Sequence, residues 1–243
     1  MLPCLLCGSD DGEKRKGLEI QCCIDCDSYA RNLQPEAISA LMKLEDIKPA
    51  FDVWWQGQRD TSLPVEQPAE VVPGLFIGDL DDASNVNKIW YNGIRTVLNL
   101  CPENLIGAYA DLPSRLTDAG IWMLATPAED QWDYDIVKNV IQQGAVDFIE
   151  TRLRFGGVLV NCWAGVNRSA AVGVAFLVLK KNFSLVDAVR ETMSQRGTVL
   201  TNRAFRRLLL EVCLANGCNL ASGDPSPKGT PSGWLNSCSF DSV

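Results

Sequence analysis

The stretch Gly-Gly-Val-Leu-Val-Asn-Cys-Trp-Ala-Gly-Val-Asn-Arg-Ser-Ala-Ala-Val-Gly-Val-Ala, residues 156–175, decides the fold of this chain. Its apolar run Val158–Val160 is typical of a buried strand, which ends at Cys162. Five residues then lead to Arg168 and Ser169, and the small apolar residues that follow predict a helix. A strand, a tight loop and a helix N-terminus together form a cradle for an anion, because backbone N–H groups converge there and the helix dipole adds positive potential.

The side chains of this loop fit phosphate chemistry. The cradle favours the thiolate form of Cys162, which is the nucleophilic form of a cysteine, and the planar guanidinium of Arg168 can hold two phosphate oxygens. The alternative is a buried structural thiol followed by a surface arginine, but Gly165 permits the tight backbone that a phosphate loop needs. The residues expected to bind the phosphate are Trp163, Ala164, Gly165, Val166, Asn167 and Arg168.

From about Glu70 to Cys218 the chain resembles the dual-specificity branch of the cysteine-dependent protein phosphatases. Besides the loop, the resemblance rests on the segments Pro73–Leu80, Gly93–Leu100 and Thr201–Phe205. It implies a set of catalytic roles for residues of this chain: Cys162 is the nucleophile, Arg168 binds phosphate, Ser169 helps the thiolate to leave, and Asn202 supports the phosphate loop.

One position departs from the family pattern. The family places a histidine directly before the cysteine, whereas this chain has Asn161. Because asparagine keeps a hydrogen-bond donor and an acceptor, we expect it to preserve part of the network behind the loop and to slow turnover without abolishing it. The same departure supports the alternative, a catalytically weak phosphatase-like adaptor that binds phosphoproteins.

Asp130 lies 32 positions before Cys162, where the family carries its general acid on a mobile loop. Such an acid protonates the leaving oxygen and accelerates the reaction about 10²–10⁴-fold. Glu129, Asp133 and Asp135 are alternatives nearby, and an acidic helix N-terminus accounts equally well for Asp133 and Asp135. We predict a two-step reaction through a phosphocysteine that requires no catalytic cofactor.

The chain contains no histidine among its 243 residues. This composition excludes Ser-His-Asp hydrolases, Cys-His proteases and metalloenzymes built on histidine. The formal charge of −8 argues against binding to nucleic acid or anionic membranes through bulk electrostatics. The loop also lacks the lysines typical of phosphoinositide phosphatases, so we expect a phosphorylated protein as the substrate.

Two Cys-x-x-Cys pairs, Cys4 with Cys7 and Cys23 with Cys26, are separated by fifteen residues. Four thiolates at this spacing predict a structural zinc ribbon or knuckle, with Cys22 as a rival ligand. The alternatives are a redox dithiol and loosely grouped buried cysteines. The segment lacks the basic face of a DNA-reading finger, so we expect a structural module or a docking site for a protein partner.

The alternation of apolar runs and helical patterns predicts an α/β fold. We expect a central, mostly parallel sheet flanked by helices, like that of the cysteine-dependent phosphatases, plus the small N-terminal zinc-binding module. Helices are expected at 33–47, 134–154, 185–193 and 202–214. The predicted division is a zinc module at 1–32, a helical connector at 33–57, a linker at 58–69, the catalytic domain at 70–218 and a disordered tail at 219–243.

The sequence also indicates where the protein works. No apolar stretch is long enough to cross a bilayer, and the N-terminus is too short and too rich in cysteine for a signal peptide. Since a working thiolate needs a reducing compartment, we expect the protein in the cytoplasm, the nucleus or both.

Cys101 follows the predicted strand Ile94–Leu100, whose end should lie at the same sheet edge as Cys162. One interpretation is a small residue that ends the strand. The other is a protective disulfide with the nucleophile under oxidising conditions.

Overall fold

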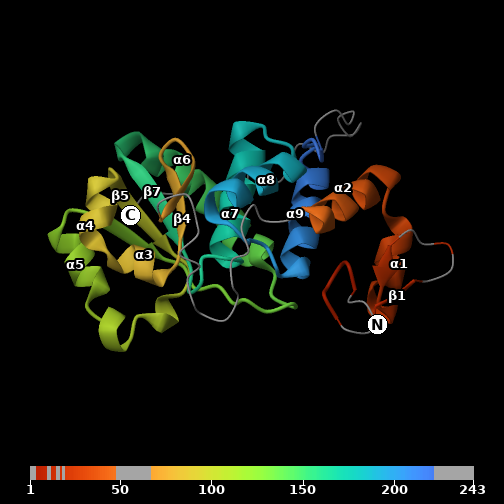
Figure 1. Ribbon diagram of the computed structural model, residues 1–243, viewed down its shortest axis with the longest axis horizontal. Helices are drawn as coiled ribbons and strands as arrows, with labels where there is room; N and C mark the ends of the chain where they lie inside the picture. Colours follow the sequence, from red (N-terminus) through yellow and green to blue (C-terminus); the bar gives the residue numbers. More distant parts are fainter. Residues whose placement is uncertain (1–3, 10–11, 15–16, 18–19, 48–66, 222–243) are drawn as a thin grey trace.

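The computed structural model of this chain contains a five-stranded sheet in the order β3-β4-β7-β5-β6 (Figure 1). The sheet forms the centre of the larger part of the structure, residues 67–221. The structure describes residues 4–9, 12–14, 17, 20–47 and 67–221. The strands are β3 (Ala69–Val72), β4 (Leu75–Gly78), β7 (Gly157–Asn161), β5 (Ile94–Asn99) and β6 (Trp122–Ala125). All neighbours pair in parallel except β3, which runs antiparallel to β4. The predicted α/β fold with a mostly parallel sheet is confirmed, whereas β3 begins inside the predicted linker.

Helices cover both faces of the sheet, and the central strand β7 divides its side chains between them. Val158 and Val160 join one buried cluster, and Leu159 joins the other. Strands buried on both faces have continuous apolar sequences, which explains the apolar run Val158–Val160. The first cluster includes α6 (Val146–Arg152), α7 (Arg168–Lys181), α8 (Leu185–Arg196) and α9 (Arg203–Ala215); the second includes α3 (Leu80–Ser84), α4 (Val86–Tyr91) and α5 (Leu112–Asp118).

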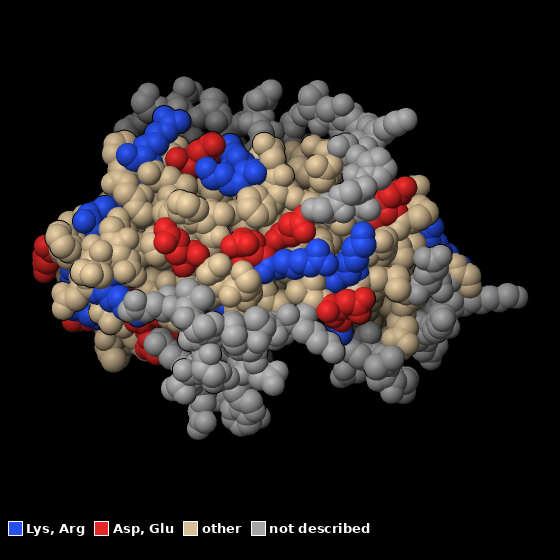
Figure 2. All heavy atoms as spheres, turned by 45° about the horizontal axis from the view of Figure 1, so that its top comes forward, with Lys and Arg blue, Asp and Glu red and all other residues tan. Residues whose placement is uncertain are grey.

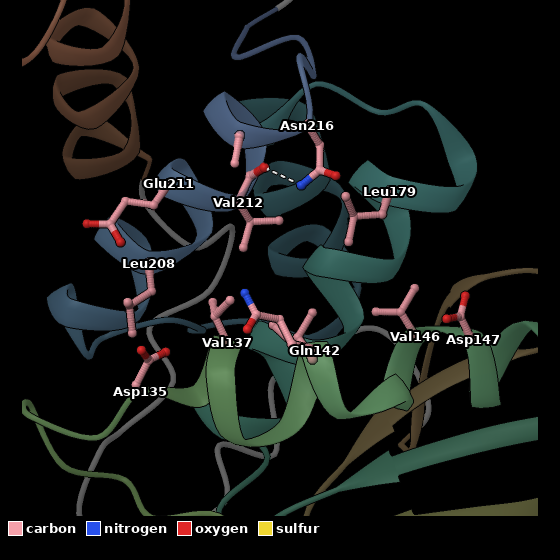
Figure 3. A pocket seen from close by; sticks show the side chains of 12 residues that line it. Asp135, Val137, Gln142, Val146, Asp147, Leu179, Leu208, Glu211, Val212 and Asn216 are labelled. Atoms are coloured by element: carbon pink, nitrogen blue, oxygen red, sulfur yellow. Dashed lines mark hydrogen bonds between the residues drawn. The ribbon is translucent and has the colours of Figure 1, made fainter. Parts of the chain in front are cut away.

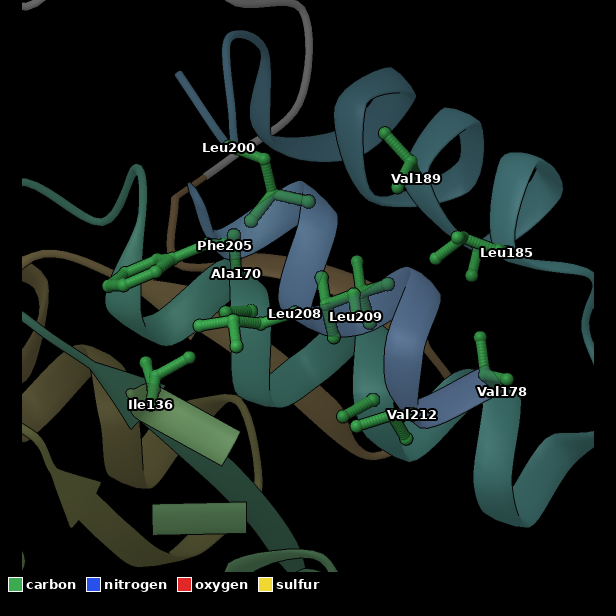
Figure 4. Close-up of a cluster of buried hydrophobic side chains, with 14 of the residues drawn as sticks. Ile136, Ala170, Val178, Leu185, Val189, Leu200, Phe205, Leu208, Leu209 and Val212 are labelled. Carbon is green, nitrogen blue, oxygen red and sulfur yellow. The ribbon is translucent and has the colours of Figure 1, made fainter. Parts of the chain in front are cut away.

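The larger cluster lies where α9 packs against α7 and α8 (Figure 4). Phe205 and Leu209 of α9 belong to this cluster with Ala170 of α7 and Leu185 of α8, and all four side chains are buried. The predicted helices at 185–193 and 202–214 are confirmed. Ser184 caps the first by accepting a hydrogen bond from the N–H of Asp187 (3.2 Å).

The predicted helix at 134–154 is divided in the structure. It consists of a π-helical segment, η3 (Val137–Ala145), followed by α6 and a short 3₁₀ turn, η4 (Leu153–Phe155). The division is caused by Gly144, whose φ of 96° lies outside the helical region. Glycine adopts such a positive φ without steric cost. α9 faces η3 across a cavity of about 300 Å³ (Figure 3). The lining residues include Val137 of η3 and Leu208 and Val212 of α9.

The N-terminal part consists of a two-stranded antiparallel sheet and two helices. β1 (Glu13–Lys14) pairs with β2 (Gln21–Cys22), and α1 (Ile24–Asn32), which the sequence analysis did not predict, follows. α2 (Pro35–Asp46), which lies within the helix predicted at 33–47, has its proline in the first turn and packs against α8 and α9 (Figure 1). Leu6 and Leu41 belong to the same buried cluster as side chains of α6, α7, α8 and α9, so the two parts of the chain share one core.

Some predicted boundaries fall on residues outside the described ones, namely most of the linker 58–69, the end of the connector 33–57 and residues 222–243 of the tail. The start of the predicted tail differs from expectation. Leu220 and Ala221 are buried, and the N–H groups of Leu185 and Val186 donate to the carbonyl oxygens of Asn219 and Leu220 (3.0 Å each). Residues 219–221 pack because they satisfy the free N–H groups at the start of α8.

On the face shown in Figure 2, acidic and basic side chains lie interspersed rather than gathered by sign. Within the described ranges, a search for an apolar helix long enough to traverse a bilayer finds none.

The contact between α7 and β4 leaves no room for a side chain at Gly173. A Cβ there would lie 2.5 Å from Cδ1 of the buried Ile77. We expect Gly173→Ala to lower the free energy of unfolding by about 1–3 kcal/mol through overpacking. In an Ile77→Val background, which lacks Cδ1, the same change should become neutral or stabilising, because alanine favours helix by about 1 kcal/mol. Urea unfolding measures both; an equal cost in the two backgrounds would contradict the packing argument.

Candidate active site

The candidate loop begins where three parallel strands end in register. Gly78 of β4 and Asn99 of β5 both pair with Asn161 of β7, and Cys162 follows at once. α7 then begins at Arg168. The loop therefore lies at the carboxyl edge of the sheet, where open α/β folds bind ligands.

The carbonyl oxygens of four consecutive loop residues are hydrogen-bonded outside the loop. The bonds run from Leu80 N to Trp163 O (3.3 Å), from Arg196 Nη2 to Ala164 O (3.3 Å), from Arg196 Nε to Gly165 O (3.3 Å) and from Leu200 N to Val166 O (2.9 Å). Because a trans peptide points its N–H away from its carbonyl, the N–H groups of residues 164–167 face inward. None of them donates to an acceptor in the described part of the chain. Convergent N–H groups of this kind form an anion-binding site.

Arg196 of α8 holds this arrangement from behind. The residue is only 7% exposed. Besides the two loop carbonyls, its guanidinium donates to Asp79 Oδ2 (3.2 Å), Asp82 Oδ2 (3.2 Å) and Gln67. A Cβ at Gly165 would lie 2.3 Å from Arg196 Nη2, and Gly165 has a φ of +68°; both facts require glycine. The sequence analysis missed Arg196, since nothing distinguishes it from the other arginines of the C-terminal helices.

Cys162 and Arg168 lie at the two ends of the loop and are both buried. Cys162 Sγ is 3.4 Å from Ser169 Oγ, as a role for this hydroxyl at the sulfur requires. Arg168 Nη1 donates to Ala128 O (3.0 Å) and to Glu103 Oε1 (3.3 Å). Its Nε has no partner in the described part of the chain. A buried donor without a partner is costly, and an oxyanion in the loop would supply an acceptor.

Asp130 is the carboxylate among the four candidates that bonds to the loop. Asn167 Nδ2 donates to its Oδ2 (3.0 Å), and Asn202 Nδ2 donates to its Oδ1 (3.2 Å). Asp135 instead accepts from the N–H of Lys138 (2.9 Å) at the start of a helix, which matches the alternative given for it. The structure thus brings Asp130 to the edge of the candidate site.

Asn167 and Asn202 connect the loop, the acid and α9. Asn167 Oδ1 accepts from Thr201 Oγ1 (3.1 Å) and from the N–H of Asn202 (3.0 Å). Asn202 Oδ1 caps α9 by accepting from the N–H of Ala204 (3.1 Å). Asn202 therefore supports the loop through its backbone, and its side chain holds Asp130.

Asn161 does not form the network expected of it. Its side chain is fully buried, and neither its Oδ1 nor its Nδ2 has a hydrogen-bond partner among the described residues. The neighbouring Asn99 bonds through Oδ1 to the N–H of Cys101 (2.9 Å), while its Nδ2 likewise lacks a partner there. Asn161 therefore places an amide behind the loop but forms no side-chain hydrogen bond to the loop among the described residues.

Cys101 is buried beside the candidate nucleophile. Burial, and then the charge of Cys162, raise the pKa of Cys101 to about 12, so its thiol is protonated at neutral pH. Each cysteine of the described residues is a free thiol. The disulfide between Cys101 and Cys162 stays a prediction.

The four predicted metal ligands come together in the N-terminal part. The Sγ atoms of Cys4, Cys7, Cys23 and Cys26 all lie within 4.8 Å of one another. Cys22 is buried but lies outside this group, so the pairing expected from the spacing is confirmed. Burial raises the pKa of Cys4, but hydrogen bonds from backbone N–H groups outweigh it and lower that pKa to about 7. N–H groups that stabilise a thiolate fit a metal-binding site.

Residues 75–213 match the family model described as the dual specificity phosphatase catalytic domain. The chain therefore belongs to the dual specificity phosphatase family.

Individual relatives agree with this assignment. Rat dual specificity protein phosphatase 26 is 38% identical over 143 residues, which cover 58% of this chain and 64% of that protein. Human dual specificity protein phosphatase 7 is 31% identical over 179 residues, 70% of this chain and 40% of that protein. The match thus spans less than two thirds of the length of these relatives.

Solved structures also resemble the chain. A mouse dual specificity phosphatase crystallised with zinc tungstate has a TM-score of 0.51 at 27% identity and covers 63% of this chain and 90% of its own. Human DUSP28 has a TM-score of 0.51 at 26% identity and covers 61% and 94%.

The burial of Arg196 against two carboxylates leads to a stability prediction. We expect Arg196→Met to lower the free energy of unfolding by about 3–5 kcal/mol, because the carboxylates of Asp79 and Asp82 would lose the buried guanidinium that pairs with both of them. Arg190→Met is the control in the same helix. Its guanidinium is 56% exposed and pairs with Asp187 at the surface, so a change of about 0.5 kcal/mol or less is expected. Urea unfolding decides; similar costs for both variants would refute the role given to Arg196.

Proposed function

We propose that this chain is a protein phosphatase that hydrolyses phosphate monoesters on tyrosine, on serine or threonine, or on both, through a phosphocysteine intermediate. The observation that carries the proposal is the cup of inward N–H groups between a buried thiol and a buried guanidinium with a free Nε. Family membership supports the same reaction class. No catalytic cofactor is needed for this chemistry.

In the first step the thiolate of Cys162 attacks phosphorus. The S–P bond forms, the P–O bond to the leaving oxygen breaks, and Asp130 gives its proton to that oxygen. The N–H groups of the loop and Arg168 stabilise the charge on the remaining phosphate oxygens. Asp130 stands at the loop edge through Asn167 (3.0 Å), where a leaving group would exit.

In the second step water releases the phosphate. Asp130, now a carboxylate, takes a proton from the attacking water while the S–P bond breaks. The hydroxyl of Ser169, 3.4 Å from the sulfur, donates to the departing thiolate. The loop and acid return to their starting protonation states.

We further place the protein in the cytoplasm, the nucleus or both, since its thiol nucleophile needs a reducing compartment. Phosphorylated proteins are its proposed substrates. The proposal includes neither nucleic acids nor membranes as partners. The N-terminal module is the part we assign to a protein partner, because it presents a surface that the catalytic chemistry does not use.

We also propose that Cys4, Cys7, Cys23 and Cys26 hold one structural zinc ion. Sulfur atoms within 4.8 Å of one another suit a tetrahedral site with Zn–S distances of about 2.3 Å. The metal would stabilise the N-terminal fold and take no part in the phosphoryl transfer.

The catalytic proposal is tested with an aryl phosphate substrate. Asp130→Asn should lower kcat about 10²-fold or more, because it removes the proton donor. Cys162→Ser should abolish turnover while keeping affinity for a phosphotyrosyl peptide in calorimetry. Asp133→Asn, three residues from the acid, is the matched control and should turn over like the unmodified protein.

A different pattern would support the rival function. If the unmodified protein binds the phosphopeptide but turns over no aryl phosphate, the chain is the phosphoprotein-binding adaptor that Asn161 favours. If Asp133→Asn and Asp130→Asn exchange their effects, the acid is misassigned.

The zinc proposal has its own test. Mass spectrometry under native conditions should find one zinc ion per chain, and Cys7→Ser should lose it together with thermal stability. Cys22→Ser is the control and should retain the metal. Equal metal content in both variants would contradict the assigned ligands.

A further inference from the structure

The acid Asp130 is held by a residue that begins α9. Asn202 Nδ2 donates to Asp130 Oδ1 (3.2 Å) and to the carbonyl of Gln131 (3.2 Å). Because Asn202 is also the N-cap of α9, the position of this helix sets the position of the acid.

The first turn of α9 is fixed from its other side by α2. Glu45, near the end of α2, accepts two bonds from Arg203, at 2.8 and 3.0 Å, and one from Arg206 at 2.8 Å. Arg203 directly follows Asn202. The bidentate pair is half-buried, and paired groups of this geometry hold orientation better than exposed single ion pairs.

The cysteine module contacts the same helix. Arg207 lies 5.6 Å above the ring of Tyr29 in α1. A cleft of about 560 Å³ separates the cysteine module from the segment that follows Asp130. Trp132 and Asp133 of that segment line the cleft opposite the cysteines. The contact of Tyr29 with Arg207 thus connects the module to α9, whose N-cap Asn202 bonds to Asp130.

We propose that the N-terminal brace, defined here as Tyr29 and Glu45, holds α9 so that Asn202 keeps Asp130 ready to donate its proton. Glu45 and Arg203 are then positioning residues for the acid. This inference rests on the proposed function. The brace belongs to this chain's N-terminal part, outside the residues 75–213 that match the family model.

Such a role has a chemical signature. A stable phenolate leaves without a proton, whereas a basic phenolate needs one, so displacing the acid slows only substrates with basic leaving groups. Loss of stability alone would slow all substrates alike. The dependence of kcat/KM on the leaving group therefore separates positioning from general support.

The experiment uses the full chain with phenyl phosphate and 2,4-dinitrophenyl phosphate. Glu45→Gln should lower kcat/KM about tenfold for the first, a part of the 10²–10⁴ that an acid contributes, and by about twofold or less for the second. Arg203→Gln leaves Arg206 paired with Glu45 and should act in the same direction, which keeps the test decisive if Glu45→Gln lowers folding. Arg190→Gln, an exposed arginine in α8, is the control and should change neither value.

A double-mutant cycle completes the test. In an Asp130→Asn background, Glu45→Gln should have no further effect on phenyl phosphate, since the acid it positions is gone. Equal losses on both substrates, or additive losses in the cycle, in variants with unchanged far-UV circular dichroism would overturn the inference. An unmodified chain without turnover on either substrate would overturn the proposed function itself.

Discussion

The site depends on one buried cation behind it. The guanidinium of Arg196 donates hydrogen bonds to the carbonyls of Ala164 and Gly165, and its charge is balanced by the carboxylates of Asp79 and Asp82. Together with the N–H groups of Leu80 and Leu200, which hold the carbonyls on either side, these bonds turn four successive peptide N–H groups to one side of the loop. The capping box of α3, formed by Asp79 and Asp82, thus shapes the candidate site around Cys162, which lies 80 positions after Asp82 in the sequence. Negative carboxylates thus pair with a positive guanidinium, and the guanidinium donates to the negative ends of the loop carbonyl dipoles. The positive ends of the same peptides, their N–H groups, are left to face an anion.

Much of this was predictable because it follows local rules. Val158–Val160 has the continuous apolar character of a strand covered on both faces, and the spacing of Cys162, Arg168 and Ser169 specified the loop. Pro35, Ser184 and Asn202 each mark a helix start by known chemistry. The four cysteines met as their spacing required.

What the sequence did not reveal depends on distant pairing or on single backbone angles. Arg196 and Glu45 find partners more than a hundred residues away, and no periodicity encodes such pairs. Gly144 divides a helix whose apolar pattern is intact, because the pattern records burial and not φ. Residues 219–221 lack apolar periodicity, yet they pack because α8 leaves N–H groups to satisfy.

Two side chains of the loop differ in how many groups they contact: Asn167 has several hydrogen-bond partners, and Trp163 is largely exposed. Asn167 bonds to Asp130, Thr201 and Asn202, whereas Trp163 is 53% exposed and meets Tyr109 edge-on at 6.4 Å. A substitution of Trp163 would therefore change one exposed ring contact, whereas a substitution of Asn167 would remove hydrogen bonds to Asp130 and to the start of α9 at once. The loop thus joins a side chain that is free to change with one that ties three separate segments of the chain together.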